Sequence, residues 1–254
     1  METKINTEAY DHLGERWYTA FDDPIALLRA QSRLRNPWII EKIAAEFGAA
    51  LPRQILDIGC GAGFLANELA KVPHHVTGID LSLGALEVAR KHDVTGTVQY
   101  LTADAEVLPF EARRFDVVCA MDFLEHVESP AKLIQEISRV LKPGGIFFFH
   151  TFNRNPVSGL LAIKALEWFI RGTPKNMHLY RLFIQPQELT RYCKAADIEV
   201  QQFIGLTPDV GALLRLEKLP LLLGALRKRQ IPEHFEFKMS QSLTVGYSGF
   251  ARRN

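Results

Sequence analysis

Three glycines follow a short apolar run that contains an acidic residue. The run Ile55–Ile58 has the character of a buried strand, and Asp57 lies within it. Gly59, Gly61 and Gly63 then occupy alternate positions, which is typical of a sharp turn from a strand into a helix with free backbone N–H groups facing a ligand. The pattern predicts a nucleotide-binding turn. The alternative interpretation is that the glycines only close a tight turn.

A second apolar run ends in Asp80, about 20 residues after Gly59, where a carboxylate can bind the two hydroxyls of a ribose. A turn that binds pyrophosphate has its third glycine one position later than Gly63, and no P-loop lysine follows. Asp57 also argues against a phosphate ligand, because a carboxylate there would repel phosphate and suit a cationic amino-acid group. The sequence therefore predicts a nucleoside that carries a positively charged substituent.

Three side chains that can bind a metal or move a proton follow the apolar segment 115–121. If their segment is helical, Asp122, Glu125 and His126 lie at i, i+3 and i+4 on one face. Two carboxylates and an imidazole at the carboxyl end of a strand can hold a hard divalent ion with open positions. The alternative is that the acid and the histidine only organise the loop.

Strand-like and helix-like segments alternate from residue 55 onward. Apolar runs predict strands at 55–58, 75–79, 98–102, 115–120, 145–151, 199–206 and 242–250, and periodic segments predict helices at 64–71, 83–92, 130–140 and 187–196. This order predicts an α/β fold, a Rossmann-like sheet of seven strands with helices on both faces. The last strand follows its predecessor without a crossover helix and is expected to run antiparallel. Residues 8–48 are expected to form a helical cap over the cofactor.

Two insertions, at about 153–185 and about 207–238, interrupt this order at the sheet edge where substrate specificity usually resides. The first contains an expected helix at about 157–171 that is apolar around most of its circumference. The second carries leucine clusters followed by Arg227-Lys228-Arg229. Burial in the core would explain either segment alone, whereas the two together favour an apolar acceptor or a membrane surface.

The composition fits a single domain that spans residues 1–254. Its 47% hydrophobic content allows a full core, and its net charge of +1 gives no basic field for nucleic acid. The sequence shows no signal peptide and no apolar run of the ~18 residues that a membrane span needs. Three scattered cysteines (Cys60, Cys119 and Cys193) are expected to be reduced packing residues. We therefore expect a cytoplasmic location.

The glycine turn resembles motif I of the class I S-adenosylmethionine-dependent methyltransferases. Longer stretches, over about Asn6 to Arg253, resemble one family within them, the ubiquinone-biosynthesis O-methyltransferases, which methylate phenolic hydroxyls of polyprenylated rings. The motifs that carry this resemblance are Cys119-Ala120-Met121-Asp122-Phe123-Leu124-Glu125-His126-Val127, Thr151-Phe152-Asn153-Arg154-Asn155, Phe183-Ile184-Gln185-Pro186-Gln187-Glu188-Leu189 and Val245-Gly246-Tyr247-Ser248-Gly249-Phe250-Ala251-Arg252.

The resemblance implies S-adenosylmethionine as the cofactor and a set of residues that bind it. Arg35 matches an arginine that reaches the cofactor carboxylate, and Asp104 and Ala105 match contacts to the adenine, although Asp104 could instead simply cap a helical turn. The other implied cofactor contacts are Asp57, Gly59, Gly61, Gly63, Asp80, Leu81 and Met121.

The resemblance also implies a magnesium-type site at Asp122, Glu125 and His126, with His126 acting as a ligand or, failing that, as the catalytic base. Two residues near the expected acceptor depart from the family's pattern. Asp122 stands where the family usually carries glutamate, and His150 where it usually carries a small hydroxylated residue.

We therefore expect methyl transfer to a polyprenylated phenol or catechol, with peripheral contact to the inner membrane and to other quinone-biosynthesis proteins. Three alternatives remain open. They are O-methylation of another small or apolar acceptor, C-methylation of a quinol ring, and a non-catalytic cofactor-binding scaffold within a biosynthetic complex.

Overall fold

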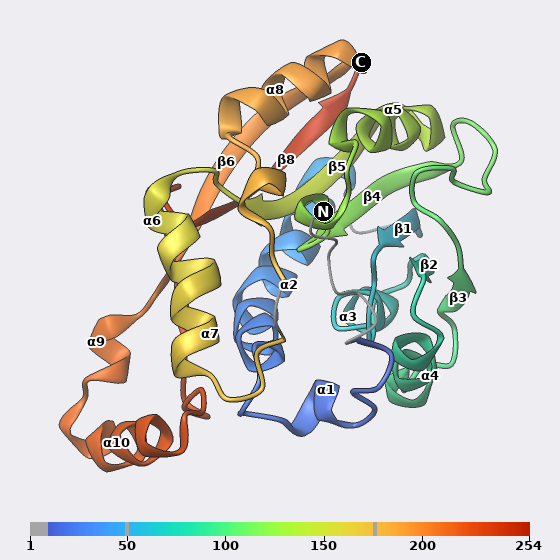
Figure 1. The fold of residues 1–254 in the computed structure, drawn as a ribbon. Coiled ribbons are helices and arrows are strands. Elements are labelled where there is room, and N and C mark those ends of the chain that lie inside the picture. Colours follow the sequence, from blue (N-terminus) through green and yellow to red (C-terminus); the bar gives the residue numbers. More distant parts are fainter. Residues whose placement is uncertain (1–9, 49–50, 175–176) are drawn as a thin grey trace.

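A computed structural model describes residues 10–48, 51–174 and 177–254. Its elements follow one another as α1 (Arg16–Thr19), α2 (Ile25–Phe47), β1 (Gln54–Ile58), α3 (Ala66–Ala70), β2 (His75–Asp80), α4 (Leu83–His92), β3 (Gln99–Thr102), β4 (Phe115–Met121), η2 (Leu124–His126), α5 (Pro130–Val140), β5 (Leu141–Phe152), α6 (Pro156–Gly159), η3 (Leu160–Ala165), α7 (Leu166–Phe169), η4 (Tyr180–Leu182), α8 (Pro186–Ala195), β6 (Ile198–Pro208), α9 (Val210–Leu213), η5 (Leu216–Lys218), α10 (Leu219–Lys228), β7 (Phe237–Ser240) and β8 (Gly246–Arg253). Helices lie on both sides of one twisted sheet (Figure 1).

The strands form one sheet in the order β3-β2-β1-β4-β5-β8-β6-β7. Strands β1 to β5 pair in parallel, and β8 is antiparallel to both β5 and β6. The α/β prediction is therefore confirmed, but the predicted number of seven strands is wrong. The additional strand, β7, begins inside the predicted second insertion and pairs antiparallel with the end of β6.

Side chains of the central strands alternate between two cores. Phe147 and Phe149 of β5 pack with α5 and α8, whereas Ile146 and Phe148 of the same strand pack with α2, α3 and α4. Strands covered on both faces are apolar at nearly every position, as is usual for parallel sheets. This double covering fixes the carboxyl ends of β1, β2 and β4 relative to one another.

The first insertion forms one continuous helical segment, α6–η3–α7, over residues 156–169, close to the predicted 157–171. Its middle part, Leu160–Ala165, is a π-helical turn. The second insertion forms α9, η5 and α10. A small core that contains Ala26, Ile170 and Ile231 joins both insertions to the start of α2. Among the described residues, no helix has both the length and the hydropathy needed to span a bilayer.

Candidate active site

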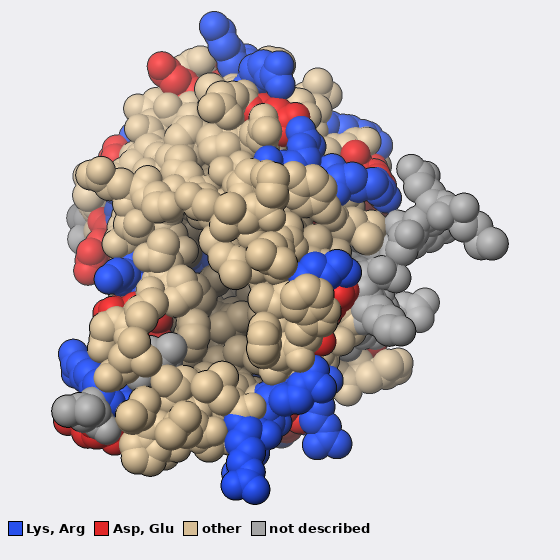
Figure 2. Space-filling view, turned by 60° about the vertical axis from the view of Figure 1, so that its left-hand side comes forward, with Lys and Arg blue, Asp and Glu red and all other residues tan. Residues whose placement is uncertain are grey.

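A cavity of about 800 Å³ lies at the carboxyl ends of the parallel strands. The loops after β1, β2, β3 and β4 line one part of it, and α2 and the two insertions line another. In the space-filling view a hollow opens on a face where few charged side chains gather, with lysines and arginines around its margin (Figure 2). Ligands of doubly wound sheets bind at this edge.

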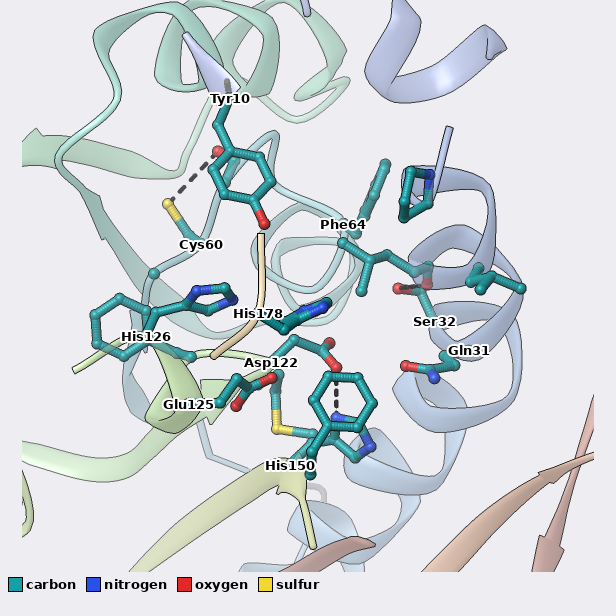
Figure 3. A pocket seen from close by; sticks show the side chains of 18 of the residues that line it. Tyr10, Gln31, Ser32, Cys60, Phe64, Asp122, Glu125, His126, His150 and His178 are labelled. Atoms are coloured by element: carbon teal, nitrogen blue, oxygen red, sulfur yellow. Dashed lines mark hydrogen bonds and ion pairs between the residues drawn. The ribbon is translucent and has the colours of Figure 1, made fainter. Parts of the chain in front are cut away.

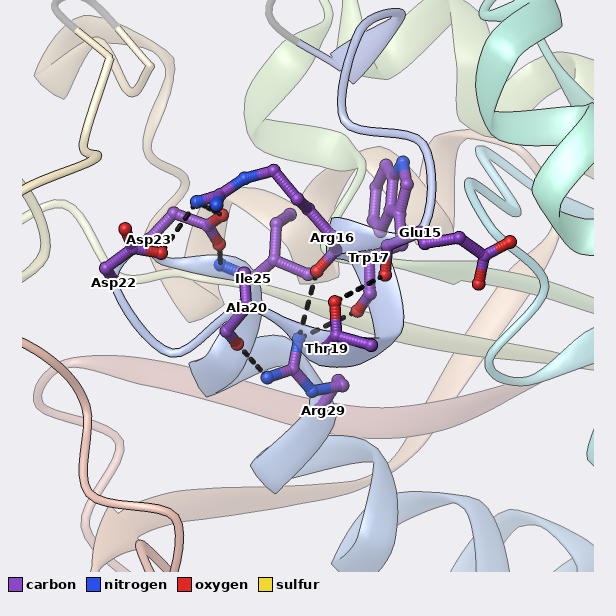
Figure 4. Close-up of polar contacts among 9 residues, drawn as sticks. All are labelled: Glu15, Arg16, Trp17, Thr19, Ala20, Asp22, Asp23, Ile25 and Arg29. Atoms are coloured by element: carbon purple, nitrogen blue, oxygen red, sulfur yellow. Dashed lines mark hydrogen bonds and ion pairs between the residues drawn. The ribbon is translucent and has the colours of Figure 1, made fainter.

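Residues from the segment 10–24 line the cavity, and arginine side chains hold this segment in place (Figure 4). Arg29 of α2 donates to the carbonyl of Trp17 at 2.8 Å, and Arg16 forms ion pairs with Asp22 at 2.6 Å and Asp23 at 3.0 Å. Asp23 in turn accepts a hydrogen bond from the N–H of Ile25, where α2 begins. These contacts hold Trp17 against the glycine turn, where it lines the cavity.

The three glycines of the turn have positive φ angles, but they serve different purposes. Gly59 and Gly61 line the cavity, and a Cβ on Gly59 would lie 2.1 Å from the Phe123 ring. Gly63 is not among the lining residues. A Cβ on it would lie 2.5 Å from the Tyr100 hydroxyl, and its N–H donates to the Cys60 carbonyl. Gly63 thus packs closely beneath the turn, and its predicted cofactor contact stays a prediction.

Asp80 joins the first two βα turns. Its Oδ2 accepts a hydrogen bond from the N–H of Gly61 at 2.9 Å, and its Oδ1 accepts from the N–H of Ser82 at 2.8 Å. Burial raises the pKa of Asp80, although the N–H groups of Ser82 and Gly61 oppose this effect. The neighbouring Leu81 also lines the cavity. These bonds fix the carboxylate between the two turns, and its contact with a ribose stays a prediction.

The predicted adenine contacts, Asp104 and Ala105, line the same cavity, as does Met121 at the end of β4. Asp104 Oδ1 accepts a hydrogen bond from the N–H of Glu106 at 2.8 Å. This bond belongs to the turn itself and matches the capping interpretation, but the side chain still borders the cavity.

Asp57 is a buried carboxyl group in the wall of the cavity. Burial raises its pKa from the ordinary value of 3.8 to about 7, while the Arg35 charge and the N–H of Ala66 act in the opposite direction. The site therefore lacks full compensation for the negative charge of Asp57 when no cationic ligand is bound.

The ligand-free protein is expected to lose stability as the pH rises between about 4 and 7, because native Asp57 holds a proton that the unfolded chain releases. Below pH 4 the raised pKa of Asp57 adds roughly a few kcal/mol to the free energy of unfolding. This contribution is lost as the pH rises to about 7. Urea unfolding at pH 4.5 to 8 should show a shallower decline in Asp57→Asn. An unchanged slope would contradict the raised pKa.

Arg35, predicted to bind the cofactor carboxylate, forms an ion pair with Asp122 in this structure. The distance between Arg35 Nη2 and Asp122 Oδ2 is 2.6 Å, and Asp122 Oδ1 contacts His150 Nδ1. Although burial raises the pKa of Asp122, the charges of Arg35 and His150 lower it well below its ordinary value. Arg35 Nε has no hydrogen-bond partner in the described part of the chain, so Arg35 keeps a donor for a ligand.

The segment that carries Asp122, Glu125 and His126 is not the helix that their shared face requires. Only Leu124–His126 forms a short 3₁₀ turn, and Asp122 has a left-handed φ of 55°. The expected α-helix, and with it the shared face, is therefore absent. Glu125 and His126 lie close to His178, and one possible ligand atom of each of these three residues lies within 4.8 Å of the others (Figure 3).

This Glu125–His126–His178 cluster is poor in compensating contacts. Glu125 is 0% exposed, and neither of its carboxylate oxygens has a partner among the described residues. Burial, followed by the charge of Asp122, raises the pKa of Glu125 to about 8, and burial lowers the pKa of His126 to about 4 and that of His178 to about 3. Both imidazoles are therefore neutral at pH 7.

The rest of the cavity is apolar and formed largely by the insertions. Its lining includes Leu27 and Leu28 of α2, Leu161 and Leu166 of the first insertion, and Leu206, Phe235 and Phe237 around the second. One continuous cavity thus has a polar part beside the glycine turn and an apolar part beneath the insertions.

Comparison with known proteins agrees with this geometry. Residues 56–149 match a family model described as a methyltransferase domain. A ubiquinone biosynthesis O-methyltransferase from Hahella chejuensis is 38% identical over 78% of this chain and 82% of its own length, and one from Alkalilimnicola ehrlichii is 37% identical over 78% and 79%. The chain belongs to the ubiquinone biosynthesis O-methyltransferase family. It is an S-adenosylmethionine-dependent O-methyltransferase.

Solved structures show how widely this fold is used. The magnesium protoporphyrin IX methyltransferase of Synechocystis PCC 6803, solved with bound SAH, superposes on the methyltransferase with a TM-score of 0.64, at 15% identity, over 98% of this chain and 96% of its own. The YcgJ protein of Bacillus subtilis gives 0.57 at 17% identity, over 87% and 99%. At these identities the likeness concerns the fold alone.

Proposed function

We propose that this methyltransferase transfers a methyl group from S-adenosylmethionine to a phenolic hydroxyl of a polyprenylated ring in ubiquinone biosynthesis. One observation carries the proposal: a single cavity extends from the Asp57–Asp80 region to the apolar side chains of both insertions. A donor with a charged sulfonium suits the first part, and a hydrocarbon chain suits the second. The names of the relatives support the pathway.

In this proposal, different residues around the cavity bind different parts of the cofactor. Asp57 faces its ammonium group and Arg35 its carboxylate, once Arg35 turns its unpaired Nε toward the ligand. Asp80 binds the ribose hydroxyls. The remaining predicted contacts surround the adenine and the turn, namely Gly59, Gly61, Leu81, Asp104, Ala105 and Met121.

The chemistry is an in-line displacement at the methyl carbon by a phenolate oxygen. The sulfonium is already activated, so orientation of the two reactants supplies much of the rate, worth roughly 7–11 kcal/mol in favourable cases. Removal of the phenol proton remains. The pKa of a phenol is about 10, so the acceptor is mostly neutral at pH 7. With a pKa of about 4, His126 is neutral at pH 7 but a weak proton acceptor, which favours its role as a metal ligand.

A divalent cation is part of this proposal, and magnesium is the ion that the resemblance implies. Glu125 fits such an ion, because its two buried carboxylate oxygens have no partner in the described residues. Glu125 and His126 would hold the cation beside the acceptor. A cation that binds neighbouring ring oxygens favours the ionised phenol.

A prenyl chain on the acceptor should increase kcat/KM strongly. Compared with an unsubstituted catechol, a catechol with two isoprene units should react at least about 100-fold more efficiently, because each buried CH₂ contributes about 0.8 kcal/mol. Labelled S-adenosylmethionine gives the rates, and mass spectrometry of the product distinguishes O- from C-methylation. Equal rates for both acceptors would favour a small acceptor.

The outer surfaces of the insertions expose apolar side chains beside cations. Trp168 and Phe169 are 60% and 62% exposed, and Leu221, Leu223 and Leu226 of α10 are also exposed. Arg171 and residues 227–229 lie nearby around a shallow depression. This combination suits the interface of an anionic membrane. We include peripheral membrane contact in the proposal. Association with other quinone-biosynthesis proteins is also included, and co-purification from membranes would test it.

The double variant Trp168→Ser/Phe169→Ser should bind anionic liposomes at least about 10-fold more weakly, because each buried aromatic contributes about 1.5–3 kcal/mol. Co-sedimentation measures the effect. The matched control is Val94→Ser, which removes an 81% exposed apolar side chain from the loop after α4. If both proteins bind like the unmodified enzyme, the insertions do not contact lipid.

A further inference from the structure

Three aromatic side chains form one wall of the cavity over the glycine turn. They are Tyr10, Trp17 and Phe64, and all three line the cavity. The Trp17 ring stacks on the Tyr10 ring, with 5.7 Å between their centroids, and meets the Phe64 ring edge-on at 5.9 Å. We call this set the aromatic wall. In Figure 3, Tyr10 and Phe64 border the same open space, and the Tyr10 ring reaches into it.

The aromatic wall lies directly on the glycine turn. A Cβ on Gly61 would lie only 3.1 Å from the Trp17 ring, so the glycine allows the ring to pack this closely. Trp17 is 5% exposed, and Phe64 comes directly after the turn in the chain. The wall is therefore held beside Asp80, which accepts a hydrogen bond from the N–H of Gly61.

Tyr10 extends the wall toward the part of the cavity that contains Glu125 and His126. Its ring is nearly perpendicular to the His126 ring, with 6.2 Å between their centroids. Burial, followed by the charges of Glu125, Asp122 and Asp80, raises the pKa of Tyr10, so its hydroxyl keeps its proton. Tyr10 therefore stands where the part of the cavity beside the glycine turn meets the part beside His126.

The electrostatic character of this region favours a cation. Arg35 is the only lysine or arginine among the described residues that line the cavity, and Asp122 already engages it. Asp57 and Asp80 contribute carboxyl groups to the same lining. The face of an aromatic ring attracts a cation, most strongly where water is excluded, and a sulfonium is such a cation. An aliphatic wall would provide burial without this attraction.

We propose that the aromatic wall recognises the positive charge of the sulfonium and makes the site selective for S-adenosylmethionine over S-adenosylhomocysteine. The inference rests on the proposed placement of the cofactor between Asp57 and Asp80. The sulfur of S-adenosylmethionine joins the ribose to the amino-acid part, so it would lie between these two carboxyl groups and against the wall. Tyr10 would contact it on the side that faces the acceptor.

The charge that the wall recognises disappears in the reaction itself. As the phenolate oxygen bonds to the methyl carbon, the S–CH₃ bond breaks and its electron pair stays on sulfur, which becomes a neutral thioether. The wall then loses its electrostatic attraction for the product. It would therefore hold the donor and release the product, which limits inhibition by S-adenosylhomocysteine.

Tyr10→Leu tests the inference, because leucine keeps an apolar side chain and removes the ring. Isothermal titration of the whole protein with each ligand alone gives two dissociation constants and needs no acceptor. Affinity for S-adenosylmethionine should fall at least about 10-fold, the size of a cation–π contact with a desolvated ring, and affinity for S-adenosylhomocysteine should change by no more than about 2-fold. Tyr10→Phe keeps the ring and should retain the selectivity of the unmodified enzyme.

The matched control is Tyr192→Leu. Tyr192 is a partly buried tyrosine of α8 that packs against the core, and it is not among the described residues that line the cavity. Its replacement should leave both affinities unchanged, and the retained affinity for S-adenosylhomocysteine verifies that each variant is folded.

Equal losses of affinity for both ligands in Tyr10→Leu would overturn the inference, because the wall would then only close the cavity. Unchanged affinity for both ligands would overturn it too. A loss of selectivity in Tyr10→Phe as large as that in Tyr10→Leu would assign the effect to the hydroxyl and overturn the role of the ring. None of these results would contradict the proposed function, which fails instead if the prenylated catechol is not methylated.

Discussion

Replacing Asp80 with alanine is expected to weaken the binding of S-adenosylmethionine and S-adenosylhomocysteine by at least about 100-fold. The carboxylate accepts hydrogen bonds from the N–H groups of Gly61 and Ser82 and so fixes the two turns between which we expect the nucleoside to bind. The variant also loses the charged acceptor for the ribose hydroxyls. Hydrogen bonds to a charged group contribute about 1.5–3 kcal/mol each, so the loss of two corresponds to roughly 100-fold or more. Isothermal titration with S-adenosylhomocysteine measures this change.

The matched control for this experiment is Asp93→Ala. Asp93 likewise accepts backbone N–H groups, those of Thr95 and Val98, but in the loop after α4, and it does not line the cavity. Asp93→Ala should reduce the melting temperature, because it removes hydrogen bonds within its own loop. It should leave cofactor affinity within about 2-fold, because Asp93 is not among the residues that line the cavity. Cofactor affinity that survives Asp80→Ala would contradict the assignment of the nucleoside to this end of the cavity.

The second large effect is expected from His126→Ala, which should lower kcat by about 10²–10⁴. Whether the imidazole holds a cation or accepts a proton, it acts on the acceptor hydroxyl and not on the donor. The affinity for S-adenosylhomocysteine should therefore stay within about 2-fold, because His126 is not expected to contact the methyl donor. Stopped assays with the prenylated catechol and titration with S-adenosylhomocysteine measure the two quantities on one preparation.

His75→Ala serves as the control and should retain full turnover, because His75 is exposed at the start of β2, at the opposite end of the strand from the cavity. A parallel loss of turnover and cofactor affinity in His126→Ala would indicate that the histidine supports the loop after β4. Glu125→Gln adds a further distinction. It preserves size, and it should abolish turnover if the carboxylate binds a cation, whereas a base mechanism through His126 would survive it.

The periodic segments of the chain were predictable because local sequence determines them. The helices expected at 83–92 and 130–140 agree with α4 and α5 at both ends. Strand β7 was missed because it is a short edge strand in which no side chain is buried, so burial leaves no pattern in its sequence. The alternate glycines predicted the turn, but spacing alone does not tell that Gly63 faces Tyr100 and not the cavity.

The candidate site was less predictable, because long-range pairing decides it. Arg35 and Asp122 are far apart in the sequence, and no local sequence pattern predicts their ion pair. Asp122 was grouped with Glu125 and His126 on the premise of an α-helix, which its left-handed backbone rules out. His178 stands in a segment with neither periodicity nor a motif, so only its position opposite His126 in space identifies it.

The pairing of β6 with β7 has a consequence for how the acceptor end could change over evolution. Pro208 lies opposite Phe237, so residues 209–236 leave the sheet and return to it at the same point, like an enlarged hairpin connection. Such an excursion can be lengthened, shortened or exchanged while both anchoring strands keep their register. New acceptor preferences can therefore arise by replacing this segment as a cassette, while the half of the molecule that binds the methyl donor is inherited unchanged.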